Sequence, residues 1–305
     1  MEELLKDILK RNQSYCTEGE VAQYIPALAR QSKENLGISV VDIGKDKVFN
    51  CGDTEKFFTL QSISKIFTLI MALQDRGANY VFERVGMEPT GDPFNSIIKL
   101  ETINPSRPLN PMINAGAIAI SSMIKGESNE QKIDRVISFL EPILGRKVTV
   151  NHEVFNSERE TGNRNRAAAY FLKDVGVISK DVEKVLDFYF MHCSLDVTCE
   201  DIGYLAAFLA NQGRSVKTGE QLVSENVTQI AKSFMVTCGM YNSSGEFAIK
   251  VGVPAKSGVG GGVMAVSPNR YGIGVWGPAL DEKGNSIAGV KMLEDLSANL
   301  NLSIF

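Results

Sequence analysis

Apolar residues recur at helical spacing through residues 1–35, and this pattern predicts a helical N-terminal segment. The period then changes. Residues 38–43 and 47–50, on either side of a polar turn at 44–46, alternate as the strands of a β-hairpin do. Residue 62 begins an apolar helical stretch that ends at Gly77, and glycine is common just beyond helix C-termini.

From about residue 80 to 235 the helical period dominates. Four stretches each present one apolar face, and we predict a helix for each: residues 131–145, 164–176, 181–193 and 199–213. From residue 238 the strand period returns, and residues 245–278 predict three strands broken by Gly, Pro and Asn turns. A last helix is predicted near residues 288–300.

The N-terminal hairpin is too small to be stable alone, and the C-terminal strands are few. We therefore expect both chain ends to join in one antiparallel sheet flanked by the terminal helices, which is an α+β architecture. This arrangement assigns residues 1–75 and 236–305 to a sheet lobe and residues 76–235 to a helical lobe, within a single domain of residues 1–305.

Composition excludes several classes of function. The net charge is −4, without a basic run, so we expect no nucleic-acid partner. The longest apolar stretch is too short to span a bilayer, so we expect no membrane insertion. Five cysteines without a C-x-x-C pair favour a reducing compartment, and we expect a cytoplasmic protein. Only His152 and His192 occur, without metal-ligand spacing, so no metal site and no cofactor are predicted.

A serine and a lysine three residues apart share one face of a helix, where a buried lysine of lowered pKa can activate the hydroxyl. This spacing occurs three times, at Ser62/Lys65, Ser96/Lys99 and Ser122/Lys125. Ser62 differs from the others because it follows a predicted strand and opens an apolar helix. Its backbone N–H is then one of the free donors of a first helical turn. The alternative is that Ser62 only caps that helix.

A second element of such chemistry is Lys256-Ser257-Gly258, between apolar strand-like stretches, because a Lys-Thr/Ser-Gly triplet on a strand accompanies Ser-x-x-Lys in β-lactamases. The similar triplet at residues 217–219 lies in a polar helix–helix connection and is discounted. The glycine run at residues 258–262 follows no βαβ pattern, so it is a poor dinucleotide loop. Glycines here better serve the close approach of a backbone N–H to a substrate.

Six segments in order resemble one family: QSISKIF, NPMINAGAI, NSERETGNRNRA, DFYFMHCS, the Met-Tyr of TCGMYNSSGEF, and PAKSGVGGG. Together they resemble the bacterial and eukaryotic glutaminases, from about residue 14 to 277. The resemblance implies the serine-dependent β-lactamase/transpeptidase-like fold and hydrolysis of the side-chain amide of L-glutamine to glutamate and ammonia. It also implies a homo-oligomer, either a dimer or a tetramer, and no extra regulatory region such as an ankyrin array is present.

The resemblance also implies a role for each matching residue. At the reacting centre, Ser62 matches the nucleophile, Lys65 its helix-borne partner, and Val259 the residue whose backbone N–H completes the oxyanion hole. Tyr241 matches a tyrosine that contacts the substrate and shares the proton transfer.

Around the substrate, Asn114 and Asn165 match binding residues, Glu158 the carboxylate that holds the substrate ammonium, and Tyr189 a second tyrosine. The chemistry agrees, because a zwitterion needs one acidic residue and several neutral hydrogen-bonding groups in one pocket.

Alternatives remain at this point. The fold also carries β-lactamases and peptidases, and a non-catalytic amino-acid-binding protein would need a similar pocket. Ser224–Asn226 supplies a Ser-x-Asn, but it lies much nearer to Lys256 than to Ser62, unlike penicillin-recognising enzymes. Structural roles are also open for four residues: a helix cap for Asn114, an ion pair with Arg164 for Glu158, and core packing for Tyr189 and Tyr241.

Overall fold

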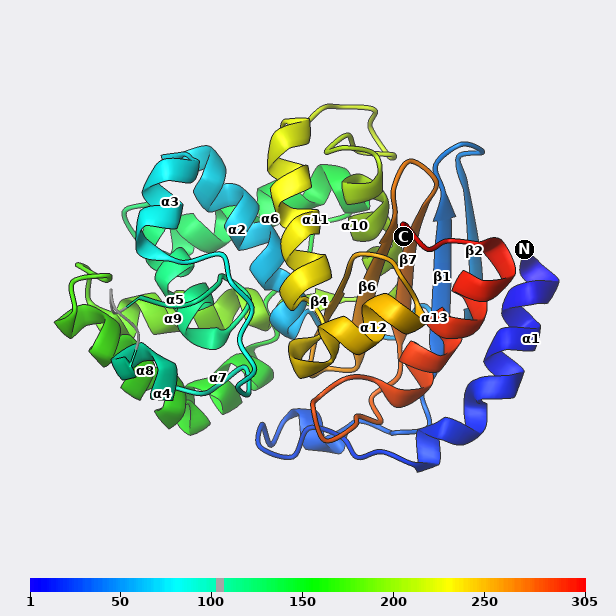
Figure 1. Ribbon diagram of the computed structural model, residues 1–305, viewed down its shortest axis with the longest axis horizontal. Coiled ribbons are helices and arrows are strands. Elements are labelled where there is room, and N and C mark those ends of the chain that lie inside the picture. Colours follow the sequence, from blue (N-terminus) through cyan, green and yellow to red (C-terminus); the bar gives the residue numbers. More distant parts are fainter. Residues whose placement is uncertain (103–106) are drawn as a thin grey trace.

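A five-stranded antiparallel sheet built from both ends of the chain organises the computed structural model, which describes residues 1–102 and 107–305 (Figure 1). The strand order is β2-β1-β7-β6-β5. The strands are β1 (Gly37–Asp42), β2 (Lys47–Gly52), β5 (Ala255–Ser257), β6 (Gly262–Ser267) and β7 (Tyr271–Trp276). The β1–β7 pairing joins the two ends, with Gly37 opposite Trp276. The α+β class and the shared antiparallel sheet are thereby confirmed.

The terminal helices α1 (Glu2–Asn12) and α13 (Ile287–Leu300) cover one face of this sheet (Figure 1). Alternate strand residues point toward them and form one apolar core with both helices; this core includes Leu5, Ile8, Ile38, Val40, Ile273, Val275, Met292 and Leu296. Two-residue alternation thus directs one set of side chains to the terminal helices and the other set to the opposite face.

Helix α10 (Cys199–Ala210) covers the opposite face at unusually close range. A Cβ at Gly272 would lie 2.0 Å from the Ala207 nitrogen, and one at Gly274 would lie 2.4 Å from the Cys199 carbonyl oxygen. Only glycine fits between the helix and strand β7 at these positions. Strand β7, at the centre of the sheet, is therefore held tightly on both faces.

The remaining helices complete the fold, with α12 beside α13 at the sheet and most of the others on the other side of the molecule (Figure 1). They are α2 (Ser64–Arg76), α3 (Ala78–Arg84), α4 (Ile98–Thr102), α5 (Asn114–Met123), α6 (Asn129–Leu144), α7 (His152–Thr161), α8 (Asn163–Asp174), α9 (Val182–Cys193), α11 (Glu225–Cys238) and α12 (Ser244–Lys250). Buried His192 on α9 ties α2 to α5, because its Nδ1 lies 2.8 Å from Ser64 Oγ and its Nε2 lies 3.1 Å from Ser121 Oγ. Burial lowers the pKa of His192 to about 3, so this histidine is a neutral structural link.

Two local predictions are wrong. The helix expected over residues 1–35 ends at Asn12, whose side chain binds the Ile8 carbonyl and Asp295, each at 2.8 Å. Short 3₁₀ turns follow, because residue 20 pairs through its backbone with Leu280 instead of continuing a helix. The strand pattern expected from residue 245 begins later, because residues 244–250 form α12. Within the described ranges, every helix is too short or too polar to cross a membrane.

Candidate active site

Ser62 lies in the 3₁₀ turn Gln61–Ile63, between the short strand β3 (Phe58–Thr59) and α2, as its sequence context predicts. Its side chain is almost fully buried. Ile63, and not Ser62, occupies the N-cap position of α2, so the helix-cap alternative is not what the structure shows. The preceding Gln61 has φ of +49°, a left-handed conformation that is uncommon for residues with a side chain and costs energy to maintain.

The two competing Ser-x-x-Lys pairs have other environments. The Ser122 hydroxyl donates to the Ala119 carbonyl within α5 at 2.6 Å, and Lys125 is exposed. Ser96 precedes α4, which begins at Ile98, so Ser96 and Lys99 do not lie on one continuous helix. Ser62 and Lys65 are therefore the pair that combines burial with a helical first turn.

Lys65 is fully buried at the first turn of α2. Its ammonium donates to the Met112 carbonyl at 3.0 Å and to Asn114 Oδ1 at 2.7 Å. Asn114 Nδ2 in turn donates to Asn165 Oδ1 at 3.0 Å. Burial lowers the pKa of Lys65 to about 8, against the opposing influence of Cys193 and Glu158. At that pKa about a tenth of the lysines are neutral at pH 7, far more than at an ordinary lysine pKa.

Tyr241 belongs to the 3₁₀ turn Tyr241–Ser243 that joins α11 to α12, and its φ is +51°. Its buried ring lies 4.6 Å from the Lys256 Nζ and 4.6 Å from the Phe94 ring. Burial raises the pKa of its phenol, while the neighbouring Ser62 side chain and the Val259 backbone oppose that rise. Over the described part of the chain, its hydroxyl finds no partner in hydrogen-bonding geometry.

Val259 sits in the glycine turn between β5 and β6, which packs against the segment leading to Ser62. A Cβ at Gly258 would lie 2.8 Å from the Leu60 carbonyl oxygen, and one at Gly260 would lie 2.9 Å from the Thr59 carbonyl oxygen. Glycine is needed here because the two backbones touch. The turn thus brings the Val259 amide to the same buried region as Ser62 and Tyr241.

Trp276 contacts both the glycine turn and the strand that precedes Ser62, a role that the sequence did not suggest. Its indole Nε1 donates to the Gly260 carbonyl at 3.0 Å, and its ring stacks on Phe58 with centroids 4.9 Å apart. One side chain therefore holds the glycine turn and the strand that precedes Ser62. The only available signal was that the single tryptophan ends a predicted strand.

Lys256 of the Lys-Ser-Gly triplet is also fully buried, and its ammonium donates to the Ser257 carbonyl at 2.6 Å. Burial lowers its pKa well below the usual lysine value, and the charge of nearby Lys65 adds to this effect. The discounted triplet behaves differently, since Lys217 lies over the Tyr204 ring at 3.8 Å. The two triplets therefore lie in different environments.

Glu158 on α7 is 7% exposed and accepts a hydrogen bond from Gln61 Nε2 at 3.0 Å. Burial raises its pKa to about 7, although the Gln61 bond and the charge of Lys65 pull it down. Arg164 donates instead to Asn95 Oδ1 at 3.4 Å, so the alternative of a Glu158–Arg164 ion pair is wrong. Within residues 1–102 and 107–305 no cation forms an ion pair with Glu158, and such a buried carboxylate is suited to receive a cationic group.

Three predicted substrate residues, Asn114, Glu158 and Asn165, line one pocket of about 80 Å³. Tyr24 and Phe94 line it as well, and neither was predicted. Tyr24 is 56% exposed as a whole residue. Its hydroxyl end nevertheless reaches buried surroundings near Tyr241 and Glu158, which raise its pKa. Its position in a segment expected to be helical gave no signal that it would cover the pocket.

Tyr189 on α9 lies behind this pocket and is 3% exposed. Its ring packs edge-on against His192 with centroids 5.3 Å apart. Burial raises the pKa of its hydroxyl, and the nearby Cys193 and Glu158 raise it further. Tyr189 therefore combines core packing with a hydroxyl near the carboxylate. In residues 1–102 and 107–305, no three His, Cys, Asp or Glu side chains are arranged to hold a metal ion.

Comparison with known proteins identifies the family. The Glutaminase family model matches residues 19–305. A glutaminase from Alkaliphilus metalliredigens is 55% identical over 306 residues, covering all of both chains, and one from Alkaliphilus oremlandii is 56% identical with 99% coverage of each. The crystal structure of a probable Bacillus subtilis glutaminase is 41% identical, with a TM-score of 0.93 over 100% of this chain and 97% of that one.

A Bacillus subtilis glutaminase in covalent complex with 5-oxo-L-norleucine, formed by reaction with 6-diazo-5-oxo-L-norleucine, is 39% identical with a TM-score of 0.91. It covers 100% of this chain and 99% of that one. Sequence and fold thus agree over the whole length, and the chain belongs to the glutaminase family of hydrolases, which act on the side-chain amide of glutamine.

Proposed function

We propose that the protein hydrolyses L-glutamine to L-glutamate and ammonia through an ester on Ser62. The observation that carries this proposal is the Gln61–Glu158 hydrogen bond of 3.0 Å. It ties the carboxylate suited to a substrate ammonium to the residue next to the nucleophile. A substrate anchored by its ammonium at Glu158 then has a fixed position relative to Ser62, and such positioning lowers the reaction barrier.

The inhibitor complex of the Bacillus subtilis relative supports a covalent mechanism. The chain of 5-oxo-L-norleucine carries its ketone at the position of the glutamine amide carbon. A diazoketone that loses N₂ leaves its terminal carbon bonded to a protein nucleophile. For that relative, an amino acid with the shape of glutamine thus reaches a nucleophile in the active site, and we assign the same role to Ser62 in this chain.

The proposed chemistry starts with attack of Ser62 Oγ on the amide carbon, while the Ser62 proton passes to Lys65 or Tyr241. The backbone N–H groups of Ser62 and Val259 stabilise the oxyanion, for about 3 kcal/mol each. The carbon–nitrogen bond then breaks, and the leaving nitrogen takes a proton from the same pair and departs as ammonia. Water attacks the ester carbonyl, and its proton returns to Ser62 as glutamate leaves.

Lys65 and Tyr241 share this work because neither suffices alone. Lys65 of pKa about 8 accepts a proton at moderate cost, but it already binds the Met112 carbonyl and Asn114. Tyr241 has a hydroxyl beside Ser62 that has no hydrogen-bond partner among the described residues, and a phenol both donates and accepts. A proton relay from Ser62 through Tyr241 toward the buried lysines satisfies both observations.

Labelling with 6-diazo-5-oxo-L-norleucine followed by peptide mass mapping tests the nucleophile. We expect a single adduct on the peptide that contains Ser62, none in Ser62→Ala, and normal labelling in Ser122→Ala, which removes the serine of another Ser-x-x-Lys pair. Ammonia release from glutamine, with asparagine and a β-lactam as competing substrates, tests the specificity. Adduct formation in Ser62→Ala, or equal rates on glutamine and asparagine, would contradict the proposal.

We also propose that the protein acts as a homo-oligomer, a dimer or a tetramer, as the family resemblance implies. Light scattering of the purified protein across a range of concentrations tests this assignment. A constant mass of 33.3 kDa would refute it.

A further inference from the structure

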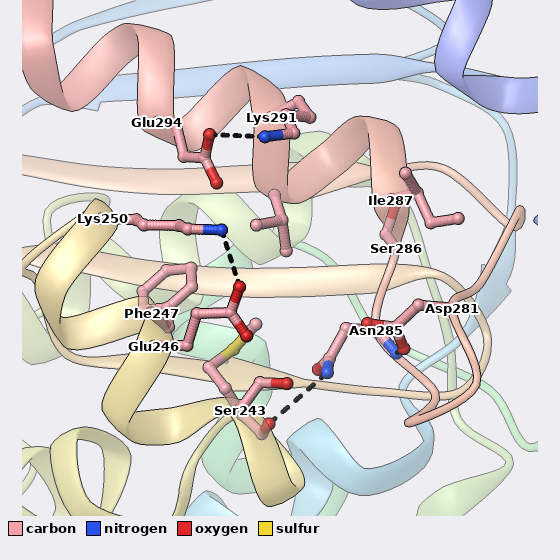
Figure 2. Close-up of a pocket in the computed structure, with 12 residues that line it drawn as sticks. Ser243, Glu246, Phe247, Lys250, Asp281, Asn285, Ser286, Ile287, Lys291 and Glu294 are labelled. Carbon is pink, nitrogen blue, oxygen red and sulfur yellow. Dashed lines mark hydrogen bonds and ion pairs between the residues drawn. The ribbon is translucent and has the colours of Figure 1, made fainter. Parts of the chain in front are cut away.

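A second cavity, of about 230 Å³, lies between α12 and α13 (Figure 2), and Met240 of its lining directly precedes the Tyr241 turn. One wall is a single face of α12 and the turn before it, formed by Ser243, Glu246, Phe247 and Lys250. The other wall is a single face of α13, formed by Ile287, Val290, Lys291 and Glu294. The loop of residues 281–286 closes one end.

The interior of this cavity is apolar, while its charges lie at the rim. Met240 and Phe247 are buried and form part of the lining together with Val290. Glu246 pairs with Lys250 at 2.6 Å and Lys291 with Glu294 at 2.9 Å, each within its own helix (Figure 2). These pairs run along the helices and leave the cavity between them open. An apolar cavity of about 150 Å³ already holds benzene, so a ring-sized molecule fits here.

The closed end of the cavity carries an unsatisfied acceptor. Asn285 is 2% exposed, and its Nδ2 donates to the Met240 carbonyl at 3.4 Å. Its Oδ1 has no hydrogen-bond partner within the described residues. Leaving such a group unpaired in the protein interior is energetically unfavourable. A ligand with an N–H or O–H group placed against Asn285 Oδ1 recovers that energy.

The charge of the lining selects among such ligands. Three carboxylates, Glu246, Asp281 and Glu294, line the cavity with Lys250 and Lys291. Lys283 adds a third cation, because its ammonium lies 3.7 Å from Glu246, so the charges around the cavity balance. Asp281 also accepts the backbone N–H groups of residues 283 and 285, each at 2.9 Å, so its charge stays at the closed end. An anionic group at this end meets the Asp281 carboxylate and offers no donor to Asn285 Oδ1, whereas an amine offers a donor and an opposite charge.

We propose that this cavity binds a small molecule with an apolar ring-sized body and one hydrogen-bond donor group, of the chemical class of a primary amine, and that its occupancy alters turnover. Met240 and Asn285 connect the cavity to the proposed catalytic residue Tyr241. Met240 lines the cavity and directly precedes Tyr241, and Asn285 holds the Met240 carbonyl. A Cβ at Gly284 of the closing loop would lie 3.5 Å from the Tyr241 ring and 3.5 Å from the Val259 side chain.

A ligand that engages Asn285 thus acts on the residue that holds the Tyr241 turn, which already has a left-handed φ. This effect on turnover rests on the proposed role of Tyr241, whereas binding itself does not. The two parts are therefore measured separately.

Benzylamine is the probe, and saturation-transfer NMR with the full-length protein measures its binding. We expect saturable binding in the wild type, at least tenfold weaker binding in Val290→Phe, which fills the cavity, and unchanged binding in Ala298→Phe. Ala298 lies on the exposed side of the same helix and controls for an added phenyl ring. Benzoate, which has the same ring and an anionic group, is expected to bind at least fivefold more weakly than benzylamine.

The same variants are assayed for ammonia release from glutamine with and without saturating benzylamine. We expect kcat to change at least twofold in the wild type and in Ala298→Phe, and to stay constant in Val290→Phe. Absent or non-saturable binding, or equal binding in Val290→Phe, would overturn the site. Saturable binding with constant kcat would overturn the coupling. A protein inactive on glutamine would refute the proposed function, while the NMR titration would still decide the site.

Discussion

Replacement of Glu158 by glutamine separates a substrate-binding role from a structural one, because the two roles predict opposite outcomes. The change removes the charge but keeps the shape and the oxygen that accepts the Gln61 hydrogen bond. A substrate ammonium in this buried pocket then lacks its counter-charge. Breaking a buried ion pair costs about 3–5 kcal/mol, which corresponds to a loss of at least ~100-fold in kcat/KM.

The size of this loss depends on pH in a defined direction. The carboxyl pKa of about 7 means that half of the unliganded wild-type molecules carry the charge at pH 7. At pH 6 only about a tenth do, so the wild type itself loses roughly fivefold in apparent affinity between pH 7 and pH 6. The difference between wild type and Glu158→Gln is therefore largest above pH 8 and shrinks below pH 7.

The ionisation of Glu158 affects the free energy of unfolding in the opposite direction. The folded-state pKa of Glu158 lies above its ordinary value of 4.5, so its contribution to stability is fully present below pH 4.5 and is lost as pH rises through about 7. Removing this ionisation relieves up to about 3 kcal/mol of unfavourable charge burial at pH 8. Glu158→Gln is therefore expected to be more stable than the wild type and much less active.

Steady-state kinetics from pH 6 to 9 and urea unfolding at pH 5 and 8 measure both effects. Glu160→Gln is the matched control, since Glu160 is an exposed carboxylate on the same helix. The reasoning is refuted if Glu158→Gln keeps kcat/KM within threefold of the wild type at pH 8.5. It is equally refuted if the variant loses stability and activity together, as a purely structural residue would.

Three further predictions concern the catalytic centre. Tyr241→Phe should lower kcat by ~100-fold with little change in KM, and it should not destabilise the protein, because it removes a buried hydroxyl without a partner among the described residues; kinetics and a melting curve check both. Trp276→Phe keeps the stacking on Phe58 but leaves the Gly260 carbonyl without its hydrogen-bond donor, so the free energy of unfolding in urea should fall by about 1–3 kcal/mol. A kcat within twofold of the wild type would contradict the positioning role of Trp276. The kcat/KM profile of the wild type should rise through apparent pKa values near 7 and 8, as Glu158 and then Lys65 lose protons, and Glu158→Gln should lack the lower step.

Local pattern predicted those elements whose burial follows their own sequence. The hairpin of β1 and β2, the apolar helix α2 and helix α13 lie where the periodicity placed them. The helix prediction for the segment after Asn12 was wrong because of a tertiary contact. A Cβ at Gly19 would lie 2.6 Å from the Leu280 carbonyl oxygen, so a partner from the other end of the chain holds this segment in a non-helical path. No window of neighbouring residues contains that partner.

The same limit applies to the site. Ser62 and Lys65 could be found because three residues on a helix fix their spacing. Tyr24, Gln61 and Trp276 could not be found in this way. Tyr24 acts as a pocket wall, Gln61 has a left-handed φ, and Trp276 makes a long-range hydrogen bond. Asn114, Glu158 and Asn165, which the family resemblance names as substrate residues, line one pocket. The individual catalytic roles and the boundaries of the two lobes stay predictions.

Two strained residues show how the fold maintains the proposed site. Gln61 and Tyr241 both have a left-handed φ, which costs about 1–3 kcal/mol each for residues with a side chain. Gln61 is held by its bonds to Glu158 and Thr59, and Tyr241 by the Asn285–Met240 hydrogen bond and the Phe94 ring.

These restraints join segments that lie far apart in the sequence: Glu158 holds Gln61 across 97 positions, and Asn285 holds the Tyr241 turn across 45 positions. The pairing of β1 with β7 joins the two ends of the chain in one sheet. The nucleophile and its proton relay therefore cannot be pre-formed in either half of the sequence. Local loosening of the β1–β7 pairing should abolish activity before it abolishes helical structure.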